Sequence, residues 1–216
     1  MRRLSQKENR VGSNPTRGTS LHNKYSHRNG NMKPYYYDIE EEIFSEELKE
    51  YVIKNSLANT DKFIAYAGAL NKLIDGNNFY YGNMISQHPE VVKVVNSCTL
   101  KCYPVVLLHK PNTLVLKHVD DPNKRNCVLI TPLYPKENYT PTWFWKKEGG
   151  FLDWQKNELE LLATCSFPNM KPAFLNTQSV HSLQTSDSYR INLQLCFDDP
   201  FELVVEKYQA GELFVR

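Results

Sequence analysis

The 216-residue sequence lacks any long apolar run, since no stretch approaches the roughly eighteen apolar residues needed to cross a bilayer. The N-terminus also lacks the apolar segment of a secretory signal. Cysteine is scarce: the five cysteines are odd in number, and their spacing fits neither a zinc site nor a disulfide framework. These absences favour a cytoplasmic protein with reduced thiols, in which the pair Cys98 and Cys102 has an ordinary packing role.

Glycine is also infrequent, with nine in the chain. The one adjacent pair, Gly149-Gly150, does not have the sequence context of a dinucleotide-binding or phosphate-binding loop, so we interpret it as a turn. No internal repeat is visible. With 41% hydrophobic residues, the chain has enough apolar material for one sizeable core, and this predicts a single folded domain.

Positive charge is concentrated at the N-terminus. Residues 1–31 carry seven arginines and lysines against Glu8, or +6, while the whole chain carries +2, so residues 32–216 carry −4. The tail has almost no apolar residues, which predicts disorder. Its segment Arg10–Thr16 resembles an in-frame reading of a transfer-RNA T-arm, so we expect the native start at Met32. The negative balance of residues 32–216 gives no support for a nucleic-acid partner.

The hydrophobic period changes along the chain and predicts an α+β fold. Helical spacing occurs within residues 40–97, with helices expected after the N-cap Ser45, from Thr60 or Asp61 to Ile74, and over Pro89–Val95. Turn-rich segments join them at Gly76–Asn78 and Tyr80–Asn83. Within residues 101–206 the pattern indicates short strands of a barrel-like or sandwich core. The expected strands are Tyr103–His109, Thr113–Val119, Cys127–Pro132, Thr142–Trp145, Leu161–Thr164, Pro172–Leu175, Val180–Thr185, Tyr189–Phe197 and Phe201–Val205.

A possible metal motif lies at the end of the second of these strands. Residues two apart in a strand share a face, so His118 and Asp120 point the same way, and Pro122 then turns the chain. A lone strand histidine is more often structural than a ligand. However, His181 lies on a later strand, and two imidazoles with one carboxylate form the facial set that binds Fe(II) and leaves coordination positions open.

The strand that begins at Arg190 alternates strictly. Its apolar face carries Ile191, Leu193, Leu195 and Phe197, and its polar face carries Arg190, Asn192, Gln194 and Cys196. A polar inward face is unusual in an ordinary core, and it indicates a lined pocket. A buried arginine requires an anion, and its planar guanidinium suits a carboxylate held by two parallel hydrogen bonds.

With His-x-Asp, a distant histidine and an arginine nine residues later, the sequence resembles the Fe(II)/2-oxoglutarate-dependent dioxygenases. Tyr103-Pro104, His118–Asn123 and Cys127-Val128 look similar to the prolyl-hydroxylase branch. The resemblance covers Lys101–Phe197. It implies a double-stranded β-helix (jelly-roll) core with N-terminal helices packed on it, within a single domain over residues 32–216.

The resemblance also implies the roles of individual residues. His118, Asp120 and His181 would be the catalytic residues that bind Fe(II), and Arg190 would hold the far carboxylate of 2-oxoglutarate. The family usually offers a further hydroxyl to that carboxylate, for which we expect Tyr134, with Thr131 as the alternative. Asn192 stands where several relatives carry serine or threonine. The implied reaction uses O2, with ascorbate as a supporting reductant, and releases succinate and CO2.

Substrate and partners are less constrained. The resemblance implies a small-molecule cosubstrate and a prolyl or other peptidyl substrate, and it leaves the oligomeric state open. Substrate selection is expected in the loops Pro135–Pro141 and Glu148–Asn157. Lys117 and Arg125 flank the site, and we interpret both as solvent-exposed. Two alternatives stay open: a cupin-like metal-binding or ligand-binding module without oxygenase turnover, and a nucleic-acid-modifying oxygenase, which the charge of residues 32–216 disfavours.

Overall fold

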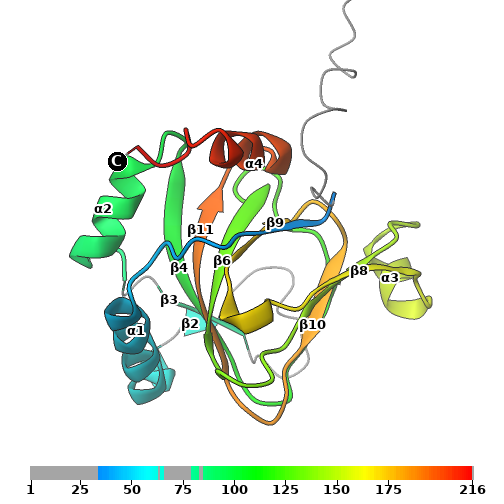
Figure 1. Cartoon of the computed structure of the whole chain (residues 1–216). Coiled ribbons are helices and arrows are strands. Elements are labelled where there is room, and N and C mark those ends of the chain that lie inside the picture. The colour runs from blue at the N-terminus through cyan, green and yellow to red at the C-terminus, as the bar shows by residue number, and fades with distance from the viewer. Residues whose placement is uncertain (1–33, 63, 66–78, 83–84, 216) are drawn as a thin grey trace, which may run out of the picture. The chain divides into compact units, whose positions relative to one another are not determined.

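The computed structural model describes residues 34–62, 64–65, 79–82 and 85–215, which all belong to the unit Met32–Arg216 (Figure 1). The predicted tail, residues 1–31, lies outside the described residues. Most of the helix predicted to end at Ile74 also lies outside them. Its start differs from the prediction, because a short 3-10 turn, η2 (Thr60–Lys62), is followed by the strand β2 (Ile64–Ala65).

The described elements are short helices and strands, most of which are labelled in Figure 1. Before the β-rich part of the chain come β1 (Tyr36–Asp38), α1 (Glu46–Ala58), η2, β2, β3 (Phe79–Gly82) and α2 (Pro89–Ser97). The remaining elements are β4 (Cys102–His109), β5 (Leu114–His118), β6 (Cys127–Tyr134), β7 (Thr142–Trp145), α3 (Phe151–Lys156), β8 (Leu161–Cys165), η5 (Pro168–Met170), β9 (Ala173–Asn176), β10 (His181–Gln184), β11 (Arg190–Phe197) and α4 (Phe201–Gln209).

The strands form two antiparallel sheets. The larger sheet has the order β1-β9-β6-β11-β4-β3-β2, and the smaller has the order β5-β10-β7-β8. Antiparallel sheets with a few helices confirm the α+β prediction in its coarse form. The last predicted strand is wrong, because Phe201, Val204 and Val205 lie three and four residues apart and form the buried stripe of α4. An apolar run as short as this one fits both the helical period and the strand period.

One face of the larger sheet packs against helices α1, α2 and α4, and we call this layer the helix-side core. From β11 it takes Ile191, Leu193, Leu195 and Phe197, which meet buried side chains such as Val52 of α1, Val91 of α2 and Val204 of α4. The predicted cap of α1 is confirmed, since the Ser45 hydroxyl accepts a hydrogen bond from the Leu48 amide at 3.2 Å. The same hydroxyl donates to Glu90 at the start of α2 at 2.6 Å.

The opposite face of the larger sheet meets the smaller sheet. This intersheet core joins Leu107 of β4, Ile130 of β6 and Leu175 of β9 to Phe144 of β7 and Cys165 of β8. Because side chains alternate along a strand, Arg190, Asn192, Gln194 and Cys196 of β11 all face this second layer. All four are buried, so both faces of β11 are covered. The space between the sheets therefore contains the polar groups of the candidate site.

Of the segments that we predicted as turns, one overlaps a strand and another leads directly into a helix. Tyr80–Asn83 overlaps β3, which pairs with β4, as tyrosine favours strands. Gly149-Gly150 does make the predicted turn, with Gly149 at a φ of 70°, but it leads into the unpredicted helix α3, where the Asp153 carboxylate accepts a hydrogen bond from the Gly150 amide at 2.9 Å. None of the five cysteines forms a disulfide. Within the described residues, every helix is too short or too polar to span a bilayer.

Candidate metal centre and anion pocket

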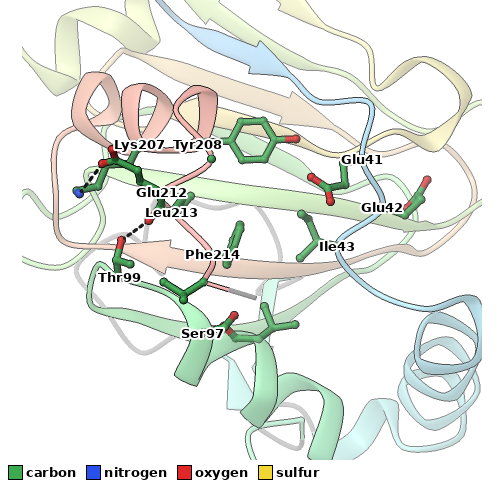
Figure 2. A pocket seen from close by; sticks show the side chains of 13 residues that line it. Glu41, Glu42, Ile43, Ser97, Thr99, Lys207, Tyr208, Glu212, Leu213 and Phe214 are labelled. Carbon is green, nitrogen blue, oxygen red and sulfur yellow. Dashed lines mark hydrogen bonds and ion pairs between the residues drawn. The ribbon is translucent and has the colours of Figure 1, made fainter.

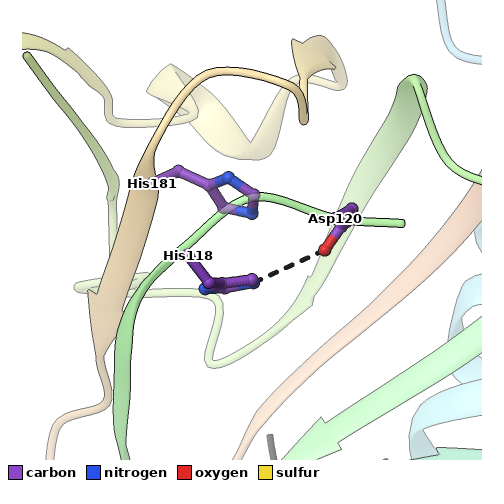
Figure 3. Close-up of side chains that lie close together, drawn as sticks. All are labelled: His118, Asp120 and His181. Atoms are coloured by element: carbon purple, nitrogen blue, oxygen red, sulfur yellow. Dashed lines mark ion pairs between the residues drawn. The ribbon is translucent and has the colours of Figure 1, made fainter. Parts of the chain in front are cut away.

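The register between β5 and β10 brings the two predicted histidines together. His181 pairs with His118 across the strands, and their ring centroids lie 4.3 Å apart. Asp120 follows β5 directly, and its Oδ1 lies 3.4 Å from Nε2 of His118. One ligand atom from each of the three residues lies within 4.8 Å of the other two (Figure 3). Among the described residues this is the one cluster of three or more histidine, cysteine or acidic side chains with metal-site spacing.

The β5 strand reaches this geometry through an irregularity that strict alternation does not predict. The register shifts between the His181–His118 pair and the Leu183–Val115 pair, so three steps on β5 match two on β10. As a result Val115 and His118 both line the pocket, while Leu114 is exposed. Bulges of this kind commonly redirect side chains next to functional sites.

Backbone carbonyls fix the orientation of both rings. Nδ1 of His118 lies 2.7 Å from the Leu116 carbonyl, and Nδ1 of His181 lies 2.9 Å from the Ser179 carbonyl. When Nδ1 donates its proton to a carbonyl, Nε2 is the atom left with a lone pair. Both rings therefore present Nε2 as the available ligand atom, as histidine ligands of metals usually do.

The backbone of Asp120 is held by the segment that precedes His181. The Asp120 amide donates to the Thr177 carbonyl at 2.9 Å, and the Gln178 side-chain amide donates to the Asp120 carbonyl at 3.3 Å. On the other side of the motif, Asp121 accepts a hydrogen bond from the Asn123 amide at 3.0 Å and so closes the predicted turn. The two halves of the cluster are thus linked through backbone groups, which sequence spacing does not reveal.

The charges of the cluster suit a divalent cation. Burial alone would raise the pKa of the Asp120 carboxyl, but the guanidinium of Arg125, followed by His118 and His181, holds this pKa below its ordinary value. Burial and the neighbouring His118 lower the pKa of His181 to about 4. At neutral pH Asp120 is therefore ionised and His181 is neutral, which are the states required of metal ligands.

Arg190 is the largest fully buried side chain of the described residues, with 1% of its surface exposed. Its Nε and Nη2 have no hydrogen-bond partner, and its guanidinium carbon lies 4.7 Å from the ring centroid of Tyr139. Burial lowers the pKa of this guanidinium. A buried cation with unused donors is costly unless an anion pairs with it. Arg190 lines the same pocket as His118, Asp120 and His181.

The other predicted contacts to a bound carboxylate are distributed differently. Asn192 faces the intersheet layer beside Arg190, and both polar atoms of its amide are buried without a hydrogen-bond partner. Tyr134 packs against the helix-side core instead. Thr131 pairs with Leu193, whose side chain also faces the helices. Tyr134 and Thr131 therefore lie towards the helices, on the side of the larger sheet away from Arg190.

Tyr139 is the phenol that lies beside Arg190, and no periodic pattern in the sequence indicates it. It belongs to the loop that follows β6, with its hydroxyl buried and without a hydrogen-bond partner. Burial raises the pKa of this phenol, while Arg190 and Asn192 act in the opposite direction. Tyr139 is therefore a neutral hydroxyl at physiological pH, able to donate a hydrogen bond to an anion.

Two residues interpreted as solvent-exposed have specific partners. The ammonium of Lys117 donates to the Trp154 carbonyl at 3.1 Å and lies 5.0 Å from the ring centroid of Trp145, so it ties α3 to β5. Arg125 lies in the pocket wall with its Nε 3.3 Å from Oδ2 of Asp120. His109 also lines the pocket, and it pairs with Arg190 in the register between β4 and β11.

Comparison with known proteins identifies the fold. No protein-family model matches the chain, and no curated protein matches it by sequence. A prolyl hydroxylase from Trichoplax adhaerens, solved with a hypoxia inducible factor oxygen degradation domain peptide fragment, aligns with a TM-score of 0.51 and 14% identity over 82% of this chain and 87% of its own.

Two further structures align less closely. A non-heme alpha ketoglutarate dependent carbocyclase from nogalamycin biosynthesis gives a TM-score of 0.48 and 14% identity over 75% of this chain and 78% of its own. A viral collagen prolyl hydroxylase from Paramecium Bursaria Chlorella virus-1 gives 0.45 and 15% over 75% and 94%. The alignment with the Trichoplax prolyl hydroxylase shows a shared fold, and it agrees with the resemblance first seen in the motifs.

Proposed function

We propose that this chain is an Fe(II)- and 2-oxoglutarate-dependent dioxygenase with a double-stranded β-helix core, which hydroxylates a substrate carbon and releases succinate and CO2. One observation carries the proposal. A cluster of two histidines and one carboxylate lines the same pocket as a buried guanidinium, that of Arg190, whose Nε and Nη2 have no hydrogen-bond partner. A metal site and an anion site in one pocket match a cosubstrate that has a chelating end and a carboxylate end.

The donor set fits a ferrous ion. Two imidazole nitrogens and one carboxylate oxygen on one side of an ion are typical of non-heme Fe(II) oxygenases. His118, Asp120 and His181 would hold the metal, and their orientation is fixed in advance by the carbonyls of Leu116 and Ser179. When bound, iron supplies the oxygen chemistry, in which O2 is consumed together with 2-oxoglutarate.

The protein's own contribution is to bind, orient and exclude water. Arg190 would pair with the far carboxylate of 2-oxoglutarate through two parallel hydrogen bonds. Tyr139 and Asn192 lie beside it and would supply further polar contacts. In this proposal Tyr139, and not Tyr134, offers its hydroxyl to the carboxylate. The two sheets enclose these groups, and burial strengthens each electrostatic contact because water is kept away.

The fold similarity also supports a peptidyl substrate. The Trichoplax enzyme was solved with a peptide fragment, and this chain shares its fold over 82% of its length. We therefore propose a prolyl or other peptidyl residue as the hydroxylated group. A cupin-like binding module is the alternative, but such a module has no need for a carboxylate-binding arginine beside its metal ligands.

The proposal is tested by turnover of the purified protein with Fe(II), ascorbate and 2-oxoglutarate. We expect succinate release, and we expect its loss in His118→Ala and in Asp120→Ala. Asp121→Ala is the matched control, because it removes the neighbouring carboxylate, which lies outside the metal cluster and contacts Asn123. A mass-spectrometric screen of proline-bearing peptides for the gain of one oxygen would identify the substrate. Wild-type turnover in both His118→Ala and Asp120→Ala would refute the assignment.

A further inference from the structure

Asp120 has two carboxylate oxygens, and the structure gives them different partners. Oδ1 lies 3.4 Å from Nε2 of His118, on the side of the metal cluster. Oδ2 lies 3.3 Å from Nε of Arg125. The side chain of Asp120 is 13% exposed and that of Arg125 is 22% exposed, so this ion pair is largely shielded from water. From this geometry, and given the proposed metal site, we propose that Arg125 is a positioning residue that occupies Oδ2 of Asp120 and leaves Oδ1 as the one oxygen available to a metal.

Arg125 is itself held in place from two directions. Its Nη2 donates to Oε1 of Gln194 at 2.7 Å, and Gln194 is 2% exposed on the intersheet face of β11. Its backbone carbonyl accepts hydrogen bonds from the hydroxyl of Thr177 and from the side-chain amide of Gln178, the latter at 3.1 Å. These contacts hold the guanidinium in place, so rotation of the Asp120 carboxylate would break the ion pair.

The consequence concerns the number of coordination positions that stay open. Carboxylates bind metal ions through one oxygen or through both. With two histidines and one oxygen of Asp120, an ion with six positions keeps three open. If Asp120 used both oxygens, two would stay open, and a chelating 2-oxo acid would fill them. Arg125 thus preserves the position that O2 requires.

Mn(II) provides a direct test, because water molecules that exchange on this ion accelerate the relaxation of bulk water protons in proportion to their number. The experiment compares wild type with Arg125→Met at saturating Mn(II), with and without 2-oxoglutarate. Lys124→Met is the matched control, since it also removes a positive charge, one residue before Arg125. The side chain of Lys124 is 71% exposed and pairs with Asp121.

We expect the relaxation enhancement per bound Mn(II) to fall by about one third in Arg125→Met and to stay unchanged in Lys124→Met. With 2-oxoglutarate added, wild type should keep about one third of its enhancement, whereas Arg125→Met should lose nearly all of it. Equal enhancement in wild type and Arg125→Met would overturn the inference. A simple loss of folding would change the number of Mn(II) ions bound, but not the enhancement of each bound ion.

Gln194→Leu is the second variant, for the case that Arg125→Met does not fold. It removes the partner of Nη2 without altering Asp120 or Arg125, and we expect a smaller decrease in the same direction. An unchanged enhancement in Gln194→Leu would then contradict the inference. The proposed metal site and the proposed role of Arg125 fail on different outcomes. If wild type binds no Mn(II), the proposed metal site fails, whereas if it binds Mn(II) and the variants match it, only the role of Arg125 fails.

Discussion

His118 and His181 lie directly opposite each other on β5 and β10, with ring centroids 4.3 Å apart. This pairing is set by the backbone register, which places two distant parts of the chain at one point. Because each ring is also anchored through Nδ1 to a backbone carbonyl, the ligand geometry exists before any ion binds. A preorganised site of this kind leads to the predictions below.

Removal of any member of the cluster should abolish metal binding. We expect His118→Ala, Asp120→Ala and His181→Ala each to weaken Fe(II) affinity by more than about 100-fold, since loss of groups that merely support ligands costs 10–100-fold. Anaerobic equilibrium binding with Fe(II) measures this. His88→Ala is the control, because His88 lies at the start of α2 and contacts Tyr51. Similar affinities in all four variants would place the metal elsewhere.

Arg190→Met should separate cosubstrate binding from metal binding. Loss of the charge-assisted hydrogen bonds should weaken 2-oxoglutarate binding by roughly 10- to 100-fold, and Fe(II) affinity should stay close to that of wild type. Because the ligand-free protein buries this cation with unused donors, the variant should unfold at an equal or higher temperature. Calorimetric titration and thermal unfolding measure the two effects. A marked loss of stability without loss of 2-oxoglutarate affinity would show a purely structural role.

Tyr139→Phe and Tyr134→Phe form a matched pair. Removal of the Tyr139 hydroxyl should raise the KM for 2-oxoglutarate by roughly 10- to 100-fold, the value of one hydrogen bond to a charged group. Tyr134→Phe should leave the KM unchanged, because Tyr134 packs against the helix-side core. Steady-state kinetics of succinate release measure both. The opposite pattern would restore the expectation drawn from the sequence.

The intersheet core should be the main source of stability around the site. Phe144 is fully buried and its ring lies 6.2 Å from that of His181. Phe144→Ala should therefore cost about 3–5 kcal/mol of unfolding free energy. Leu152→Ala on α3, where the side chain is 63% exposed, should change it by less than about 0.5 kcal/mol. Urea unfolding followed by circular dichroism measures both values, and similar costs would contradict the described packing.

The pH dependence of stability should reflect His109. Burial and the charge of Arg190 hold the pKa of His109 well below its ordinary value of about 6.5. Below pH 6.5 the unfolded chain therefore binds a proton that the folded chain does not, so stability falls as the pH decreases. His109→Gln should show a smaller loss of urea midpoint between pH 7.5 and 5. An identical loss in both proteins would indicate that His109 is protonated in the folded state.

Periodicity predicted those parts of the fold in which one period is unambiguous. β11 alternates strictly over eight residues, whereas β4 and β6 are mostly apolar runs. All three lie where the sequence indicated, and β6 extends two residues beyond the expected end at Pro132. Periodicity failed at α4, where the apolar run is short, and on β5, where a local bulge interrupts the alternation of side chains. α3 was missed because its six residues are too few to establish a helical period.

The site residues also divide into those that the sequence could predict and those that it could not. His118, Asp120, His181 and Arg190 could be proposed because strand spacing and residue type together restrict them, and the structure brings all four to one pocket. Tyr139 lies in a loop, where spacing carries no information about direction. The partner of Arg125 depends on how residues 120–125 pack against Thr177 and Gln178, which is a tertiary contact without a local sequence signal.

The most direct test of the account is an anaerobic calorimetric titration of 2-oxoglutarate into the protein, with and without bound Fe(II). The account predicts binding of one 2-oxoglutarate per chain that requires Fe(II), disappears in Asp120→Ala and weakens in Arg190→Met. Binding that is equal with and without the metal, or no binding to the Fe(II)-loaded protein, would contradict it.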